Sequence, residues 1–342
     1  MWSIIDKIRD LYHEYIGGNK TISDYKEGDK IKLATDIAGV AIFGPSFIFK
    51  TKLGELIIDE AADKLIEIID NDDVTKAYAY LTNNTGIVDR SDSSVFEIIE
   101  GALGLSNYLI AGSGGSSLVG NGGNNTLQGG IGKDSFVYSG DNDVVLNYAT
   151  GDIINFVSDF IGVGISANDF LLNSSNGSVI IRDALDKIID VADVDNNIFT
   201  RAYISSTATE LDGRGISGTE VIIGGNDGGD MIYSGDGGSS LWGGEGNFND
   251  SLFGGAGQDE IFYMVGNGQD EIFNVNSKDI INLLGVNLDQ IVDAVINDDS
   301  SQIRFTDGGS LNILGQAGKF LLNGKAYFAD YQNKRWLTDG ET

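Results

Sequence analysis

The sequence predicts a mainly β protein with an N-terminal α unit, followed by two tandem β-solenoid modules that each end in a β cap. Three observations support this prediction. Glycine supplies 48 of the 342 residues but proline only 1, a combination unlike that of flexible linkers. From residue 103 onward, the glycines recur with a period of nine. Before that point, apolar residues are spaced as on helices.

Residues 1–102 are expected to form an all-α domain. The clearest apolar stripe runs through Leu53–Ile69, and Ser94 with Glu97 has the spacing of a capping box at a helix start. Along the helix that begins at Leu53, an acidic residue recurs at every fourth position. This row indicates a solvated face, with a cation or partner site as the alternative. The expected helices are 1–16, 53–69, 74–81 and 94–101.

An uncharged run of 13 residues, Ile37–Phe49, lies between the first two expected helices. It is too short to span a bilayer as one helix, which takes about 20 residues, and Gly44-Pro45 interrupts it. Two interpretations stay open. The run forms the core of the helical domain, or it inserts into a membrane beside amphipathic helices.

Two nonapeptides share one template. GGIGKDSFV (Gly129–Val137) and GGAGQDEIF (Gly254–Phe262) both fit G-G-x-G-x-D-x-U-x, where U is a large apolar residue. Glycine allows the positive φ angles of a tight turn, and carboxylates are ligands that hard cations prefer. Each copy therefore predicts a turn that offers a carboxylate, followed by a short strand with one inward apolar side chain.

The Asp position of this template occurs five times in each of two arrays. Two steps of the second array are two residues longer, and such insertions map to loops of a solenoid. The position falls on Asn107, Ser116, Asn125, Asp134 and Asp143 in the first array, and on Asp230, Ser239, Asp250, Asp259 and Asp270 in the second.

Each array is followed by a related β segment, so we interpret the two halves as one duplicated module. GDIINF (151–156) parallels KDIINL (278–283), and a hairpin-like pair of strands follows in both halves. Such segments would cover the exposed end of a solenoid. The predicted division is an all-α domain (1–102), a first roll (103–150), its β cap (151–215), a second roll (216–276) and a C-terminal cap (277–342).

The tandem nonapeptides resemble those of the RTX family of secreted, calcium-binding, glycine-rich repeat proteins. The resemblance covers about 103–330 and implies that each nonapeptide forms half a turn of a parallel β-roll. It also implies several Ca²⁺ ions, bound between turns on the same side by template carboxylates and by carbonyls of the glycine turns. The implied ligand residues are Asn125, Gly129, Gly130, Gly132, Asp134, Asp143, Asp230, Asp250, Gly254, Gly255, Gly257, Asp259 and Asp270.

Charge distinguishes the two arrays. On one side of the second roll all three template residues are Asp, whereas the first roll has Asn at two of the equivalent positions. Because calcium affinity depends on ligand charge, residues 216–342 are expected to bind calcium more tightly than 103–215. For the first array, Asn and Ser side chains that stack without metal are an open alternative. For Asp152 and Asp279, a turn role and metal ligation are both open.

The formal net charge is -29, from 51 acidic and 22 basic residues. This charge favours bound cations and argues against a nucleic-acid partner, which needs a basic surface. Crowded carboxylates oppose folding, so calcium binding should be coupled to folding. The chain would stay extended inside a calcium-poor cell and fold outside it.

By the resemblance, type I secretion machinery exports the chain through an uncleaved C-terminal signal within 277–342, because the N-terminus shows no signal peptide. The expected location is extracellular or at the bacterial cell surface.

Residue counts argue against an enzyme. The chain has one histidine, His13, and no cysteine, which excludes Ser/His and Cys/His pairs and histidine-based zinc sites. No glycosidase-like carboxylate pair can be singled out among the acidic residues. The predicted function is therefore a secreted calcium-binding protein with a structural, adhesive or interaction role. The alternative is a membrane-active toxin or bacteriocin-like protein that contacts a cell surface through its N-terminal helices.

Overall fold

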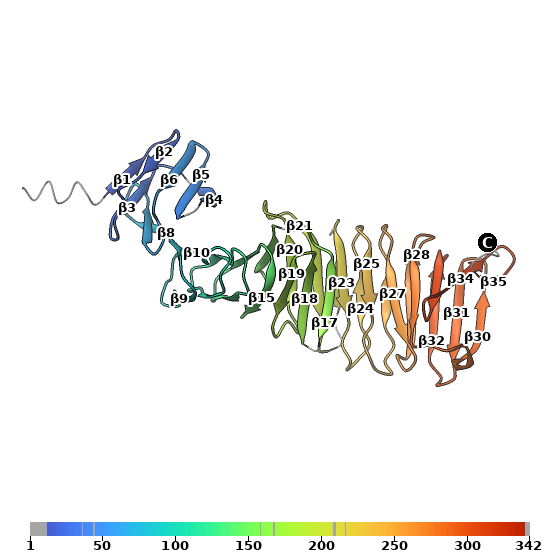
Figure 1. Ribbon diagram of the computed structural model, residues 1–342. Coiled ribbons are helices and arrows are strands. Elements are labelled where there is room, and N and C mark those ends of the chain that lie inside the picture. Colours follow the sequence, from blue (N-terminus) through green and yellow to red (C-terminus); the bar gives the residue numbers. More distant parts are fainter. Residues whose placement is uncertain are drawn as a thin grey trace, which may run out of the picture. The chain divides into compact units, whose positions relative to one another are not determined.

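The computed structural model describes residues 12–338 apart from seven single positions, and Figure 1 shows the order of its strands. The chain divides into two compact units, Met1–Asp183 and Ala184–Thr342. Regular structure in the described residues is β-strand, except for the short 3-10 helix η1 (Leu288–Gln290). The chain is therefore mainly β, and stacked parallel strands form a β-solenoid. The seven positions are Asp36, Gly44, Ser158, Ala167, Ala208, Thr209 and Ile216.

The first unit begins with two small sheets. In one sheet β1, β3 and β7 pair in parallel and β8 joins β7 antiparallel. In the other, β2 pairs in parallel with β6, which continues antiparallel to β5 and β4. Tyr15, Phe47 and Leu56 are among the fully buried side chains of their common core. The strands are β1 (Tyr12–Tyr15), β2 (Lys20–Ile22), β3 (Lys30–Leu33), β4 (Ile37–Phe43), β5 (Ser46–Thr51), β6 (Gly54–Ile58), β7 (Leu65–Ile69) and β8 (Thr75–Leu81).

The predicted all-α domain is therefore wrong. The helix expected over 53–69 is two strands, β6 and β7. In the turn between them Glu60 and Asp63 adopt positive φ angles of 49° and 59°, which end any right-handed helix. Within β6, Leu56 and Ile58 are buried and Ile57 faces the other side, which is the period of a strand.

The other expected helices are also wrong where the structure describes them. The segments at 74–81 and 94–101 form β8 and β10, so Ser94 and Glu97 make no capping box. The helix expected over 1–16 lies largely outside the described residues, and its last part forms β1. The Ile37–Phe49 run forms the β4–β5 hairpin, in which Phe47 and Phe49 are fully buried. The structure thus favours the core interpretation of this run.

From residue 86 onward, the first unit stacks parallel strands in two sheets. In one sheet β8, β10, β12, β14 and β16 follow in order. In the other, β9, β11, β13, β15 and β19 follow in order, and β18 and β17 extend it antiparallel. The strands are β9 (Gly86–Asp89), β10 (Phe96–Glu100), β11 (Asn107–Ile110), β12 (Ser116–Val119), β13 (Thr126–Gln128), β14 (Ser135–Tyr138), β15 (Asp141–Leu146), β16 (Ile153–Phe156), β17 (Gly162–Ser166), β18 (Asp169–Ser174) and β19 (Gly177–Ile181).

The second unit repeats this plan. After the β20–β21 hairpin, β21, β23, β25, β27, β29 and β33 pair in parallel, and β34 and β35 close this sheet antiparallel. In the other sheet β22, β24, β26, β28 and β32 pair in parallel, followed by antiparallel β31 and β30. The strands are β20 (Ile188–Ala192), β21 (Ile198–Ile204), β22 (Glu210–Asp212), β23 (Thr219–Ile223), β24 (Met231–Tyr233), β25 (Ser239–Trp242), β26 (Ser251–Phe253), β27 (Glu260–Met264), β28 (Gln269–Val275), β29 (Ile280–Leu284), β30 (Ile291–Ile296), β31 (Ser300–Phe305), β32 (Ser310–Gly315), β33 (Lys319–Leu322), β34 (Lys325–Asp330) and β35 (Arg335–Thr338).

The apolar position of every nonapeptide points into the solenoid, and all ten side chains are buried. Each stacks on its counterpart in the next parallel strand of the same sheet, as Leu109 does on Leu127. The inward side chains are Leu109, Leu118, Leu127, Phe136 and Val145 in the first array, and Ile232, Leu241, Leu252, Ile261 and Ile272 in the second.

One strand order occurs three times along the chain: a solenoid strand, a three-stranded meander, and a hairpin. It covers β3–β8, β16–β21 and β29–β34. Details match at a shift of 123 residues. The hydroxyl of Tyr25 donates to the carbonyl of Asp29 at 2.7 Å, and that of Tyr148 to the carbonyl of Asp152 at 2.5 Å. The N-terminal strands are thus a third copy of the β cap, and the domain boundaries proposed from the sequence remain predictions.

Candidate metal centre

The template residues form buried rows on the two sides of each roll. Strand register places Asn107, Asn125 and Asp143 on successive turns of one side, with Ser116 and Asp134 on the other. The second array places Asp230, Asp250 and Asp270 on one side, with Ser239 and Asp259 on the other. All ten are buried, so the structure brings together alternate repeats of each array.

The Asp259 carboxylate accepts hydrogen bonds from two directions. In Asp259, Oδ1 accepts the backbone N–H of Ser239, one turn earlier, at 2.8 Å. Its Oδ2 accepts the N–H of Gly255, in its own turn, also at 2.8 Å. The pattern recurs in Asp230, whose Oδ2 accepts the N–H of Gly225 at 2.7 Å. The carboxylates therefore link consecutive turns and satisfy backbone donors that would otherwise be buried without partners.

The predicted glycines let neighbouring turns touch backbone to backbone. A Cβ on Gly130 would lie 1.7 Å from the carbonyl oxygen of Gly112, and one on Gly255 would lie 1.8 Å from that of Gly235. Any larger residue would separate the turns. A Cβ would lie 2.2 Å from the neighbouring turn at Gly132 and at Gly257, and 2.9 and 3.0 Å from the template carboxylate at Gly129 and Gly254.

Burial disfavours the charged form of these carboxylates. It raises the pKa of Asp134 and of Asp143 to about 6, that of Asp250 to about 7 and that of Asp270 to about 8. Repulsion between neighbours in the row adds to the effect, as Asp250 does for Asp270. When these rows ionise, they hold desolvated negative charge, which a cation between the turns would stabilise.

The residues present fit a cation such as Ca²⁺. Oδ1 of Asp134 is buried and has no hydrogen-bond partner, so it is open to a ligand. Among the described residues, no three acidic or histidine side chains converge on one point. A calcium ion, which takes six to eight oxygen ligands, would therefore draw most of them from backbone carbonyls of the turns.

In the first array, an amide takes part of the role expected of a cation. Nδ2 of Asn125 donates to the carbonyls of Gly122 and Gly123, both at 3.0 Å, and to Oδ1 of Asp143 at 3.1 Å. These are oxygens that an ion between the turns would need. On this side, an amide ladder that needs no metal is therefore built into the fold.

Asp152 and Asp279 continue the rows beyond the last nonapeptide. Oδ1 of Asp152 accepts the N–H of Asp134 at 2.9 Å, and Oδ1 of Asp279 accepts that of Asp259 at 2.9 Å. Their second oxygens accept N–H groups of their own turns, which gives both residues the turn role considered from the sequence.

Glu97 and Glu220 extend the rows at the opposite end, and sequence reasoning missed them. They pair in register with Ser116 and Ser239. Both are 1% exposed. A search for acidic residues one turn before each array would have found them, although their flanking residues do not fit the template.

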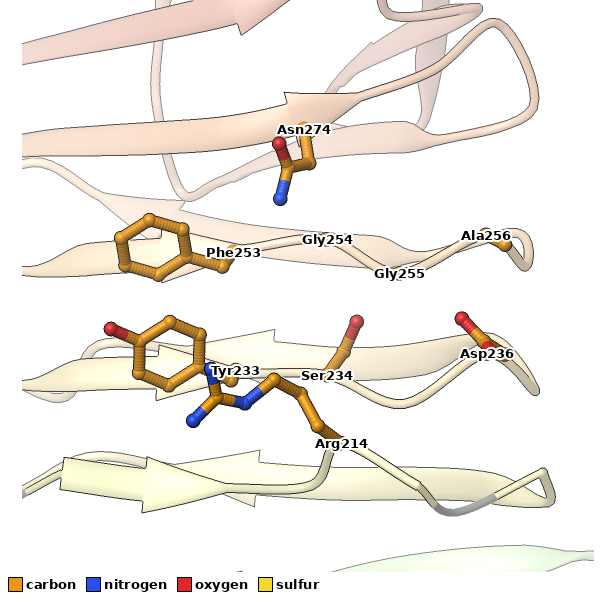
Figure 2. Close-up of a pocket in the computed structure, with 9 residues that line it drawn as sticks. All are labelled: Arg214, Tyr233, Ser234, Asp236, Phe253, Gly254, Gly255, Ala256 and Asn274. Atoms are coloured by element: carbon orange, nitrogen blue, oxygen red, sulfur yellow. The ribbon is translucent and has the colours of Figure 1, made fainter.

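The outer face of the second array carries an aromatic stack (Figure 2). Tyr233 and Phe253 lie 4.4 Å apart, and Phe253 and Phe273 lie 4.6 Å apart, each pair nearly parallel. The guanidinium of Arg214 covers Tyr233 at 4.2 Å, and Arg214, Tyr233 and Phe253 line an open hollow with Asn274. The stack follows from strand register, since equivalent positions of consecutive turns hold aromatic residues.

Comparison with known proteins agrees with this geometry. The RTX calcium-binding nonapeptide repeat family, in four copies, matches residues 110–145 and 248–270. The resemblance drawn from the sequence is thereby confirmed, and the chain carries the repeats of the RTX family. No curated protein sequence matches the chain.

Among solved structures, the chain is similar to the crystal structure of the extracellular lipase LipA from Serratia marcescens, with 14% identity and a TM-score of 0.29. The match covers 85% of this chain and 43% of that one.

None of the described segments forms an apolar helix of membrane-spanning length.

Proposed function

We propose that this protein is a secreted calcium-binding structural protein whose β-rolls fold when they bind extracellular calcium. The rows of buried template carboxylates carry this proposal. They combine raised pKa values with a net charge of -29 and with turns that offer backbone oxygens. A chain with such rows gains most of its stability when a cation neutralises them, so binding energy becomes folding energy.

The repeats also support export before folding. Where calcium is scarce, the rows repel one another and the chain stays extended, as passage through a type I secretion channel would require. Outside the cell, calcium fixes the rolls, and we propose an adhesive or interaction role at the cell surface. The membrane-active alternative is not favoured, because the expected N-terminal helices are strands where the structure describes them and the Ile37–Phe49 run lies in a hairpin that buries Phe47 and Phe49.

Far-UV circular dichroism of the whole chain tests the proposal. Samples stripped of metal by a chelator are measured alone, with millimolar calcium and with millimolar magnesium. We expect a gain of β signal with calcium only, because magnesium demands stricter octahedral geometry and gives up its water reluctantly. An unchanged spectrum in calcium would show that the turns fold without metal, and the export argument would fail with it.

A further inference from the structure

We propose that the second array binds a calcium ion between Glu220 and Asp259, at the turn whose own template residue is Ser239. The inference rests on the proposed calcium binding of the array, and it adds a ligand outside the nonapeptides. Strand register places Glu220 on β23 directly beside Ser239 on β25, with Asp259 on the next turn of the same row.

Glu220 supplies the carboxylate that Ser239 lacks. Its Oε2 accepts the backbone N–H of Gly235 at 2.6 Å and lies 3.3 Å from the hydroxyl of Ser239. In the next turn of this row, the equivalent glycine, Gly255, donates to the Asp of its own turn. The longer side chain of Glu220 reaches one turn forward and fills the same position.

The second oxygen of this carboxylate is open to a ligand. Oε1 of Glu220 is buried and has no hydrogen-bond partner. Around the same turn, the hydroxyl of Ser234 lies 3.4 Å from the carbonyl oxygen of Gly235 and 3.5 Å from Oδ1 of Asp259, at the limit of hydrogen bonding. Glu220, Ser234, Ser239 and Asp259 are each at most 5% exposed. Such a dry set of oxygens, with two carboxylates and few donors, suits a hard cation.

The equivalent place in the first array has a cation of its own. Glu97 lies 123 residues before Glu220, and Nε of Arg90 donates to its Oε1 at 2.9 Å. The residue 123 positions after Arg90 is Gly213, which offers no charge. A Cβ on Gly213 would lie 2.3 Å from Oε1 of Glu220, so glycine is needed here for the carboxylate to lie this close to the backbone. Oε2 of Glu97 is also buried without a hydrogen-bond partner, so the two arrays differ in the positive charge that Arg90 supplies to Glu97.

Arg201, which pairs in register with Glu220, is already engaged. Arg201 lowers the pKa of Glu220, against the larger opposite effect of burial. Its Nε, however, donates to Oδ1 of Asp190 at 2.6 Å on the neighbouring strand of the hairpin. The charge of Arg201 is therefore shared, and the second array has no counterpart of the direct Arg90–Glu97 ion pair among its described residues.

The experiment compares Glu220→Gln with Glu97→Gln in the whole chain. Isothermal titration with calcium counts the ions bound, and thermal unfolding at low and at saturating calcium gives the stabilisation by the metal. For Glu220→Gln we expect one ion fewer than the parent chain and a smaller rise of Tm in calcium. For Glu97→Gln we expect the parent number of ions and a lower Tm in both conditions, because only the Arg90 ion pair is lost.

A further variant separates ligation from packing. Ser239→Asp, added to Glu220→Gln, restores a carboxylate at the template position and should restore the missing ion. The inference is overturned if Glu220→Gln binds as many ions as the parent chain with unchanged affinity, or if the double variant fails to regain the ion while it folds in calcium. Absence of calcium binding in the parent chain would instead refute the proposed function.

Discussion

The backbone N–H of Asp230 donates a hydrogen bond to Oδ1 of Asp250 at 2.8 Å. The Asp250 carboxylate thereby closes the turn before its own, and Asp270 does the same for Asp250 at 3.0 Å. Carboxylates held in this way cannot move apart, so their desolvation and mutual repulsion are part of the folded state. A divalent cation between the turns would relieve both.

The charge of this row predicts that calcium affinity differs between the arrays. Asp250→Asn keeps the oxygen that accepts the Asp230 N–H but removes the charge, and we expect calcium affinity to fall roughly tenfold to a hundredfold. Asp134→Asn, in the first array, should lose less, because amides already serve part of that roll. Calcium titrations of both variants measure the difference, and equal losses would contradict the asymmetry.

The close contact between turns predicts that glycine is required by sterics at the second template position. Gly130→Ala should lower the free energy of unfolding by about 3 kcal/mol, because its Cβ would overlap the carbonyl of Gly112. Denaturant unfolding in saturating calcium gives the value. Gly162→Ala is the matched control, since nothing lies within 4 Å of its added Cβ, and it should change the free energy by no more than about 1 kcal/mol. Similar losses in both variants would show that the contact between Gly130 and Gly112 does not determine the cost.

The rolls could be predicted from the sequence because Asp, Asn or Ser recurs at one fixed position of every repeat. At Asp259 the side chain closes the turn, links it to the previous one, and sets the inward position of Ile261 two residues later. Because several positions of each repeat are constrained in this way, the template can be recognised in the sequence. Period and composition were therefore enough to give the fold of the arrays and the rows of candidate ligands.

The N-terminal strands could not be predicted in this way, because they lack the template. Their apolar residues fit a helix only when strand and turn are counted together, as in β6, the following turn and β7. The turn is fixed by positive φ angles at Glu60 and Asp63, residue types that also occur in helices. Comparison of this segment with the one 123 residues later would have revealed the shared cap. The role of Glu220 was not predicted for a related reason. Its side chain extends into the next turn, and the residues around it do not fit the nonapeptide template.

The aromatic stack predicts a stabilising role for the outer face. Phe253→Leu keeps most apolar area but removes two ring contacts, and it should cost about 1–3 kcal/mol of unfolding free energy. Leu252→Ala, one residue away and 1% exposed, should cost about 2–5 kcal/mol because it leaves a cavity in the core. Both are measured by denaturant unfolding in calcium. A neutral Phe253→Leu would show that the rings meet without stabilising the roll.

Glu100, at the end of β10, predicts a pH dependence that is separate from the metal rows. Burial raises its pKa from 4.5 to about 7, although Asn121 donates to its Oε2 at 3.1 Å. The folded chain then keeps a proton that the unfolded chain releases between pH 4.5 and 7. The free energy of unfolding therefore falls as pH rises through this window, by about 3 kcal/mol in all, and stays low above pH 7.

Glu100→Gln isolates this contribution, because glutamine is neutral at every pH and still offers an oxygen to Asn121. In saturating calcium, the variant should match the parent chain near pH 4.5 and exceed it by about 3 kcal/mol at pH 8. Glu271→Gln, at an exposed position of β28, is the control and should follow the parent chain across the range. If the difference between Glu100→Gln and the parent chain does not grow with pH, Glu100 is already ionised in the fold and burial does not hold its proton.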